Sequence, residues 1–129
     1  MQKNFLIIAC VLAVLAVILG AFGAHGLKPR LSPDQLGSFE TGIRYQFYHA
    51  FALFITVFLF DKYSSGLAVY AGYAFTVGVV LFSGSIYLLA TRELIGLSSY
   101  KWLGPITPLG GTFLIVGWLL LLVSVINHK

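Results

Sequence analysis

Charged residues and cysteine are scarce in this sequence. Charged side chains make up only 9% of its 129 residues, whereas soluble domains carry about 25%. The net charge is +4, but no basic stripe alternates with aromatic residues as it does in nucleic-acid-binding proteins. The single Cys10 excludes a disulfide within the chain. The scarcity of charge argues against a soluble domain and favours a membrane protein, with membrane lipids and no nucleic acid as partners.

The standard catalytic and nucleotide-binding signatures are absent as well. The sequence contains no Walker loop, dinucleotide fingerprint, HExxH, CxxC or GxSxG motif. Ser98 and Ser99 have no evident base, and no tight His/Cys spacing indicates a metal site. We therefore expect no enzyme, no catalytic residue, no metal and no cofactor.

What the sequence does contain is four long apolar runs, and hydrophobic residues make up 59% of it. A helix of about 20 apolar residues crosses the roughly 30 Å hydrocarbon core of a bilayer, so each run predicts a transmembrane helix. We expect the first run to be retained as a helix, because it exceeds the ~7–15 apolar residues of a signal peptide. The expected helices cover about residues 4–23, 41–60, 67–90 and 108–126.

A short interfacial helix is expected over about residues 33–40. Ser32 is a suitable N-cap, and Gln35 three residues later completes a capping box. This helix either ends at the membrane surface or continues straight into the second span, with its glycines as weak points. The predicted fold class is all-α: one transmembrane domain over residues 1–129, folded as an integral membrane four-helix bundle.

The polar side chains of the second span are concentrated at its start, from Glu40 to His49. At 100° per residue, Glu40, Arg44 and Tyr48 follow one face of a helix, with Tyr45 and His49 on the adjoining face. The opposite stripe is expected to face lipid; it consists of Ile43, Phe47, Ala50 and Phe54. A lone charge at the centre of a transmembrane helix costs roughly 2.5–3.5 kcal/mol, so these polar groups are expected to have partners.

Two interpretations of this polar cluster remain open. In one, Glu40 and Arg44 pair across one helical turn as a structural clamp, and the histidines are hydrogen-bonded structural residues. In the other, the cluster binds a ligand, with tyrosines that stack on it or hydrogen-bond to it. The candidate ligand-binding residues are His25, Lys28, Glu40, Arg44, Tyr45, Tyr48 and His49.

Other segments predict how the helices pack. Ala16, Gly20 and Ala24 form a small-xxx-small row that allows another helix to approach closely. Thr107 can cap a fourth helix that starts at Pro108, after a Pro- and Gly-rich segment. The same segment also permits a short irregular dip into the membrane where it is buried against protein.

Four spans place both termini on one side of the membrane and the first and third loops on the other. Basic residues on the loop side are Lys28, Arg30, Arg44, Arg92 and Lys101, against Lys3, Lys62 and Lys129 on the terminal side, which is 5 against 3. The positive-inside rule therefore predicts a multi-pass protein of the cell (inner) membrane with the first and third loops in the cytoplasm.

Three motifs carry a resemblance to a known family. They are Gly20-Ala-Phe-Gly-Ala-His-Gly-Leu-Lys28, Glu40-Thr-Gly-Ile-Arg-Tyr-Gln-Phe-Tyr-His-Ala50 and Gly104-Pro-Ile-Thr-Pro-Leu-Gly-Gly111. In this order, they resemble the bacterial membrane family called domain of unknown function 423, to which eukaryotic transmembrane protein 256 is similar. The resemblance implies a four-helix inner-membrane protein and brings no established activity.

The sequence leaves several functions open. The first is binding of a lipid-like or small amphiphilic ligand at the polar cluster, or a role as an accessory subunit of a membrane complex. The alternative is an oligomeric transporter of small solutes, ions or protons, because four helices are few to enclose a path. Besides lipids, other membrane proteins or a second copy of the chain are open as partners.

Overall fold

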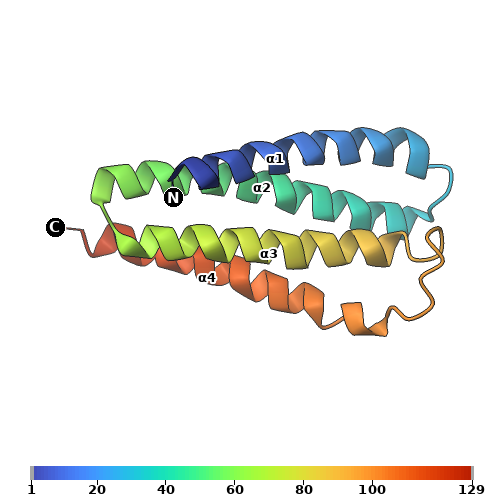
Figure 1. The fold of residues 1–129 in the computed structure, drawn as a ribbon. Helices are drawn as coiled ribbons and strands as arrows, with labels where there is room; N and C mark the ends of the chain where they lie inside the picture. Colours follow the sequence, from blue (N-terminus) through green and yellow to red (C-terminus); the bar gives the residue numbers. More distant parts are fainter. Residues whose placement is uncertain (1, 129) are drawn as a thin grey trace.

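The computed structural model describes residues 2–128, and its regular structure there is helical (Figure 1). The elements are α1 (Gln2–Phe22), the π-helical η1 (Gly23–Leu27), α2 (Pro33–Tyr63), α3 (Gly66–Ala90), the 3-10 turn η2 (Lys101–Leu103) and α4 (Ile106–Ile126). Four of these segments are long and apolar enough to cross a membrane. The predicted all-α membrane fold of four helices is therefore confirmed.

Successive helices run antiparallel, and neighbours in sequence are neighbours in space (Figure 1). α2 and α3 form the centre, α1 packs on α2, and α4 packs on α3 with a smaller contact to α2. The α1–α2 and α3–α4 connections lie at one end, which we call the loop end. Both termini lie toward the other end, as an even number of spans predicts.

The segment predicted as a separate interfacial helix is the first part of α2. The capping box forms as expected: Gln35 N–H donates to Ser32 Oγ, and Ser32 N–H donates to Gln35 Oε1. Of the two possibilities for its end, the continuous one forms: α2 runs past residue 40 without a break to Tyr63. Thr41 Oγ1 donates back to the Gly37 carbonyl at 3.0 Å, and Gly42 packs against α3, so neither glycine ends the helix.

The row of small residues on α1 packs against α2 over part of its length. Ala16 is fully buried, and a Cβ on Gly20 would lie 4.0 Å from the Ile43 side chain, whereas Ala24 is exposed. The stripe predicted to face lipid is wrong for Ile43, which lies against α1, and for Ala50; both are buried. A helix surface and lipid are both apolar, so hydrophobicity does not distinguish them.

α3 and α4 approach closely through glycines. A Cβ on Gly110 would lie 2.4 Å from the backbone nitrogen of Phe82, and one on Gly78 would lie 2.6 Å from Leu114. α4 starts at Ile106, so the prediction that Thr107 caps it is wrong. The Thr107 hydroxyl instead lies 2.5 Å from Ser85 Oγ and joins α4 to α3.

Candidate functional site

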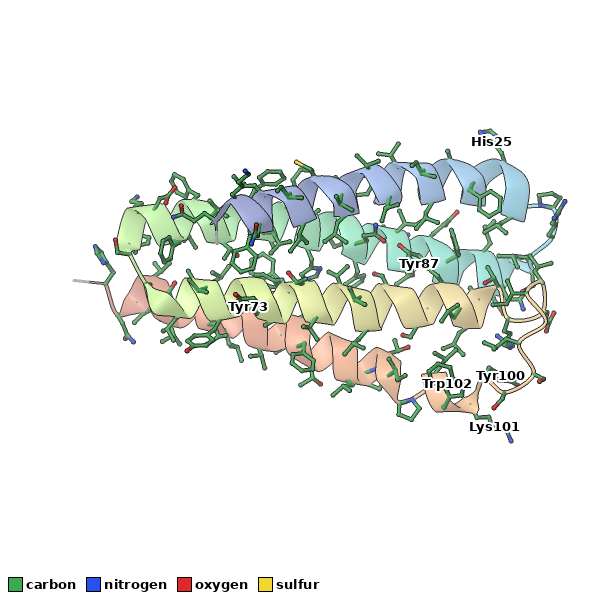
Figure 2. All side chains as sticks on the ribbon, viewed as in Figure 1. His25, Tyr73, Tyr87, Tyr100, Lys101 and Trp102 are labelled. Carbon is green, nitrogen blue, oxygen red and sulfur yellow. The ribbon has the colours of Figure 1, made fainter. Side chains whose placement is uncertain are left out.

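In the structure, several residues of the predicted site lie in separate places. His25 and Lys28 are exposed at the loop end, and Figure 2 shows His25 pointing away from the bundle. His49 is buried midway along α2, so the two histidines lie at different depths. Among residues 2–128, no group of three or more His, Cys, Asp or Glu residues is placed to hold a metal ion.

The charged pair of α2 lies on the outside of the bundle. Glu40 and Arg44 are both exposed. The Arg44 guanidinium donates to Thr41 Oγ1 at 3.0 Å, within its own helix. Arg44 therefore does not form the predicted clamp to neighbouring helices. Its side chain lies along the surface of α2.

Three of the predicted residues come together with side chains from α3 and α4. They line a cavity of about 520 Å³ between α2 and α4, which we call the aromatic groove. Its lining residues are Tyr45, Tyr48, His49, Phe82, Gly111, Leu114, Ile115 and Trp118. The centroid of the Tyr45 ring lies 4.8 Å from that of Phe82 and 5.7 Å from that of Tyr48, so Tyr45 packs against both rings.

His49 is fixed in the wall of this groove by both ring nitrogens. Nδ1 lies 2.7 Å from the Tyr45 carbonyl, which can only accept, so Nδ1 carries the proton. Nε2 accepts from the Trp118 indole N–H at 3.1 Å. The imidazole is thus a neutral link between α2 and α4, and it orients the Trp118 ring rather than offering a free base.

The phenol groups provide the polar part of the aromatic groove. Tyr45 is 39% and Tyr48 54% exposed, whereas His49 is 4% exposed. The two tyrosines are therefore accessible to a molecule in the groove, and the imidazole behind them is not.

A second cavity lies nearer the loop end. It is an open pocket of about 460 Å³, and we call it the loop-end pocket. Its lining residues are Asp34, Gln35 and Ser38 of α2, Ile86, Leu89 and Ala90 at the end of α3, Arg92 just after α3, Gly104 just before α4, and Thr107 in the first turn of α4. Charged and polar groups thus meet apolar side chains in one pocket.

The two cavities follow one another along the same helix faces. At 100° per residue, Asp34, Ser38, Tyr45 and His49 fall within about 60° on α2. On α4, Thr107, Gly111, Leu114 and Trp118 fall within a similar arc of about 60°. α3 contributes to both cavities, through Ile86 and Phe82. The cavities are therefore a polar and an aromatic section of one face, between α2 and α4.

The structure also uses polar residues that the predicted site leaves out. Gln46 Nε2 donates to the Leu12 carbonyl of α1 at 2.7 Å, and Tyr87 Oη donates to Gln46 Oε1 at 2.6 Å. Figure 2 shows Tyr87 between α2 and α3. The signal in the sequence was an amide inside a transmembrane span, which must find partners there.

Trp118 is another residue that sequence reasoning missed. Its indole N–H lies near the middle of α4, where only a buried acceptor such as His49 can satisfy it. A single tryptophan in an apolar run does not indicate which helix supplies that acceptor, so the pair is visible only in the fold.

Comparison with known proteins adds a family and no activity. The model of the family described as "Protein of unknown function (DUF423)" matches residues 19–111. The chain is 42% identical to UPF0382 membrane protein YwdK of Bacillus subtilis (strain 168), over 98% of this chain and 99% of that one. It is 39% identical to UPF0382 membrane protein SH2409 of Staphylococcus haemolyticus, over 95% of each chain. The comparison with solved structures found no match.

Proposed function

Since this chain belongs to the DUF423 family of membrane proteins of unknown function, we propose that it binds a lipid-like amphiphile in the loop-end pocket and the aromatic groove. The observation that carries the proposal is the order of the two cavities along one face. The section at the loop end is lined by charged and polar groups, and the section deeper in the membrane is lined by aromatic and aliphatic groups. An amphiphile in a bilayer has its polar and apolar parts in the same order.

The dimensions support a lipid of the leaflet at the loop end. Asp34 and Tyr48 are 14 residues apart on α2, which is about 21 Å at a rise of ~1.5 Å per residue. Half of a bilayer, headgroups included, is about 20–22 Å thick. The cavity volumes, about 460 and 520 Å³, lie in the range of roughly 300–1,000 Å³ that is common for ligand sites.

Each section contributes differently to binding. Within a membrane an apolar chain leaves lipid for protein, so the aromatic groove adds shape and van der Waals contact rather than a hydrophobic driving force. Fixed rings favour such contact because little freedom is lost on binding. Tyr45 and Tyr48 offer phenol hydrogen bonds, and the charged groups of the loop-end pocket offer the stronger, charge-assisted ones.

Filling the aromatic groove tests this function. Ile115 lines it and is 62% exposed, so Ile115→Trp adds a ring to the groove without displacing core residues. We expect the fraction of protein with a retained lipid to fall about tenfold, which corresponds to ~1.4 kcal/mol. Native mass spectrometry of the protein released from lipid nanodiscs measures the adduct.

The matched control is Leu119→Trp, on the same helix and 54% exposed but outside the groove lining. It adds the same ring to the lipid-facing surface of α4 and is expected to leave retention unchanged. Equal retention in Ile115→Trp and the unaltered protein would contradict binding in the groove.

The orientation is part of the same proposal: a multi-pass protein of the inner membrane with the loop end in the cytoplasm. The charge bias supports this, although Lys129 lies outside the described residues. In a Cys10→Ser background, Ser98→Cys lies in the α3–α4 connection and Ser64→Cys lies in the α2–α3 turn. We expect an impermeant maleimide to label Ser64→Cys in intact cells and Ser98→Cys only after lysis; the opposite pattern would reverse the orientation.

A further inference from the structure

We propose that the loop-end pocket selects a headgroup with a phosphate and a primary ammonium, as in a phosphatidylethanolamine, with Arg92 binding the phosphate and Asp34 the ammonium. This inference rests on the proposed function and specifies its ligand class. It starts from the two opposite charges that line one cavity, one from the first turn of α2 and one from the segment after α3.

Arg92 is held ready for an anion. One Nη1–H donates to the Leu89 carbonyl at 2.7 Å, and the guanidinium lies 4.9 Å from the centre of the Tyr100 ring. These contacts fix the position of the side chain without neutralising it, because a carbonyl and an aromatic ring carry no net charge. A guanidinium has five N–H donors in a planar fork that matches phosphate, so most of them are left for a ligand.

Asp34 argues against a purely anionic headgroup. Its carboxylate would repel a second negative charge beside Arg92, whereas an ammonium group would be attracted and would donate to it. The charged groups that line the pocket are one cation and one anion. They match a zwitterion, and such charge matching provides specificity more than raw affinity.

The lining also favours a primary over a quaternary ammonium. Quaternary ammonium groups are recognised by cages of aromatic rings. The lining of the loop-end pocket contains no aromatic residue; its neutral members are Gln35, Ser38, Ile86, Leu89, Ala90, Gly104 and Thr107. A primary ammonium needs acceptors instead, and the Asp34 carboxylate together with the hydroxyl of Ser38 provides them.

A lipid, rather than the free headgroup, is the occupant that the surroundings favour. Ile86, Leu89 and Ala90 give the pocket an apolar wall, which a soluble phosphoethanolamine would leave without a partner. The aromatic groove then follows on the same face toward the middle of the membrane, where the chains of a lipid would lie.

The test uses the full chain in nanodiscs that contain equal amounts of phosphatidylethanolamine, phosphatidylglycerol and phosphatidylcholine with identical acyl chains. Native mass spectrometry then identifies the lipid retained. For the unaltered protein we expect phosphatidylethanolamine to be enriched roughly tenfold over the other two lipids, as the loss of one charge-assisted hydrogen bond would imply. Excess soluble glycerophosphoethanolamine should not displace it.

Two variants separate the two halves of the headgroup. Arg92→Gln should lower phosphatidylethanolamine retention about tenfold. Asp34→Asn should keep retention but remove the preference over phosphatidylglycerol, and Asp34→Lys should reverse it. Arg30→Gln is the matched control, because Arg30 is an exposed cation of the loop end outside the pocket lining.

The outcomes distinguish the two proposals. Retention of lipid without headgroup preference, or a preference that survives Asp34→Asn, would overturn the headgroup assignment and leave lipid binding intact. A roughly tenfold fall in lipid retention in Ile115→Trp together with selectivity in the unaltered protein would support both proposals. No retained lipid in the unaltered protein would overturn both, and displacement by the soluble headgroup would show that the pocket binds the free molecule instead.

Discussion

Gly110→Ala is expected to destabilise the bundle by about 1–3 kcal/mol, the usual cost of overpacking a well-packed contact. The added Cβ would lie 2.4 Å from the nitrogen and 2.8 Å from the Cα of Phe82. These are backbone atoms of α3, so the contact cannot be relieved by a change of side-chain rotamer. α3 and α4 must move apart, which weakens the packing that Gly78 and Gly117 also maintain along the same seam.

The neighbouring glycine provides the control. A Cβ on Gly111 would meet only the Phe82 ring, at 3.6 Å, which is ordinary contact. Gly111→Ala is therefore expected to change the free energy of unfolding by no more than about 0.5 kcal/mol, as for substitutions away from special features. Equilibrium unfolding in mixed micelles with increasing dodecyl sulfate measures both variants. Equal effects at the two positions would show that α3 and α4 are not in the close contact described.

Gln46→Leu is expected to cost about 1–2 kcal/mol, which is the range for interhelical hydrogen bonds in membrane model peptides. Leucine fills a similar volume but removes the bond to the Leu12 carbonyl of α1 and the bond from Tyr87 of α3. It also leaves the Tyr87 hydroxyl without its acceptor in a setting that lacks water. The same unfolding measurement applies.

A double-mutant cycle isolates this interaction. Tyr87→Phe removes the bond to Gln46 but leaves the bond from Gln46 to the Leu12 carbonyl, so its cost should be smaller than that of Gln46→Leu. In the double variant neither partner remains unsatisfied, so the combined cost should be less than the sum of the single costs. Additive costs would mean that Gln46 and Tyr87 do not interact in the membrane.

The number of helices, their approximate extents and their alternation could be predicted from the sequence. Apolar runs of spanning length identify transmembrane helices directly, and the capping box at Ser32 places the start of α2 correctly. The boundary that was left open and the one that was wrong both lie where local signals compete. The continuation through residue 40 and the start of α4 at Ile106 depend on contacts with neighbouring helices.

The candidate site could be predicted only in part. Tyr45, Tyr48 and His49 do line one cavity, because their spacing keeps them on one side of α2. Their partners Phe82 and Trp118 come from other helices, and no local pattern relates residues so far apart in the chain. We propose that Asp34 and Arg92 bind the headgroup. In the sequence, however, Asp34 indicates only a carboxylate at the start of a helix, and Arg92 indicates only a cation in a loop.

The sequence by itself determined that the chain crosses a membrane and how its spans alternate. Leaving apolar residues in water costs free energy, and so does leaving backbone groups without hydrogen bonds in lipid. Both costs depend on local composition and length. Only the tertiary structure decided which faces meet. Lipid and helix surfaces are equally apolar, so hydrophobicity does not orient a helix about its axis within the bilayer. For this reason Ile43 faces α1 and Ala50 is buried, while the charged Arg44 lies on the outside. Close approach at Gly110 and the hydrogen bonds of Gln46 and His49 set those rotations, and they exist only once the helices are together.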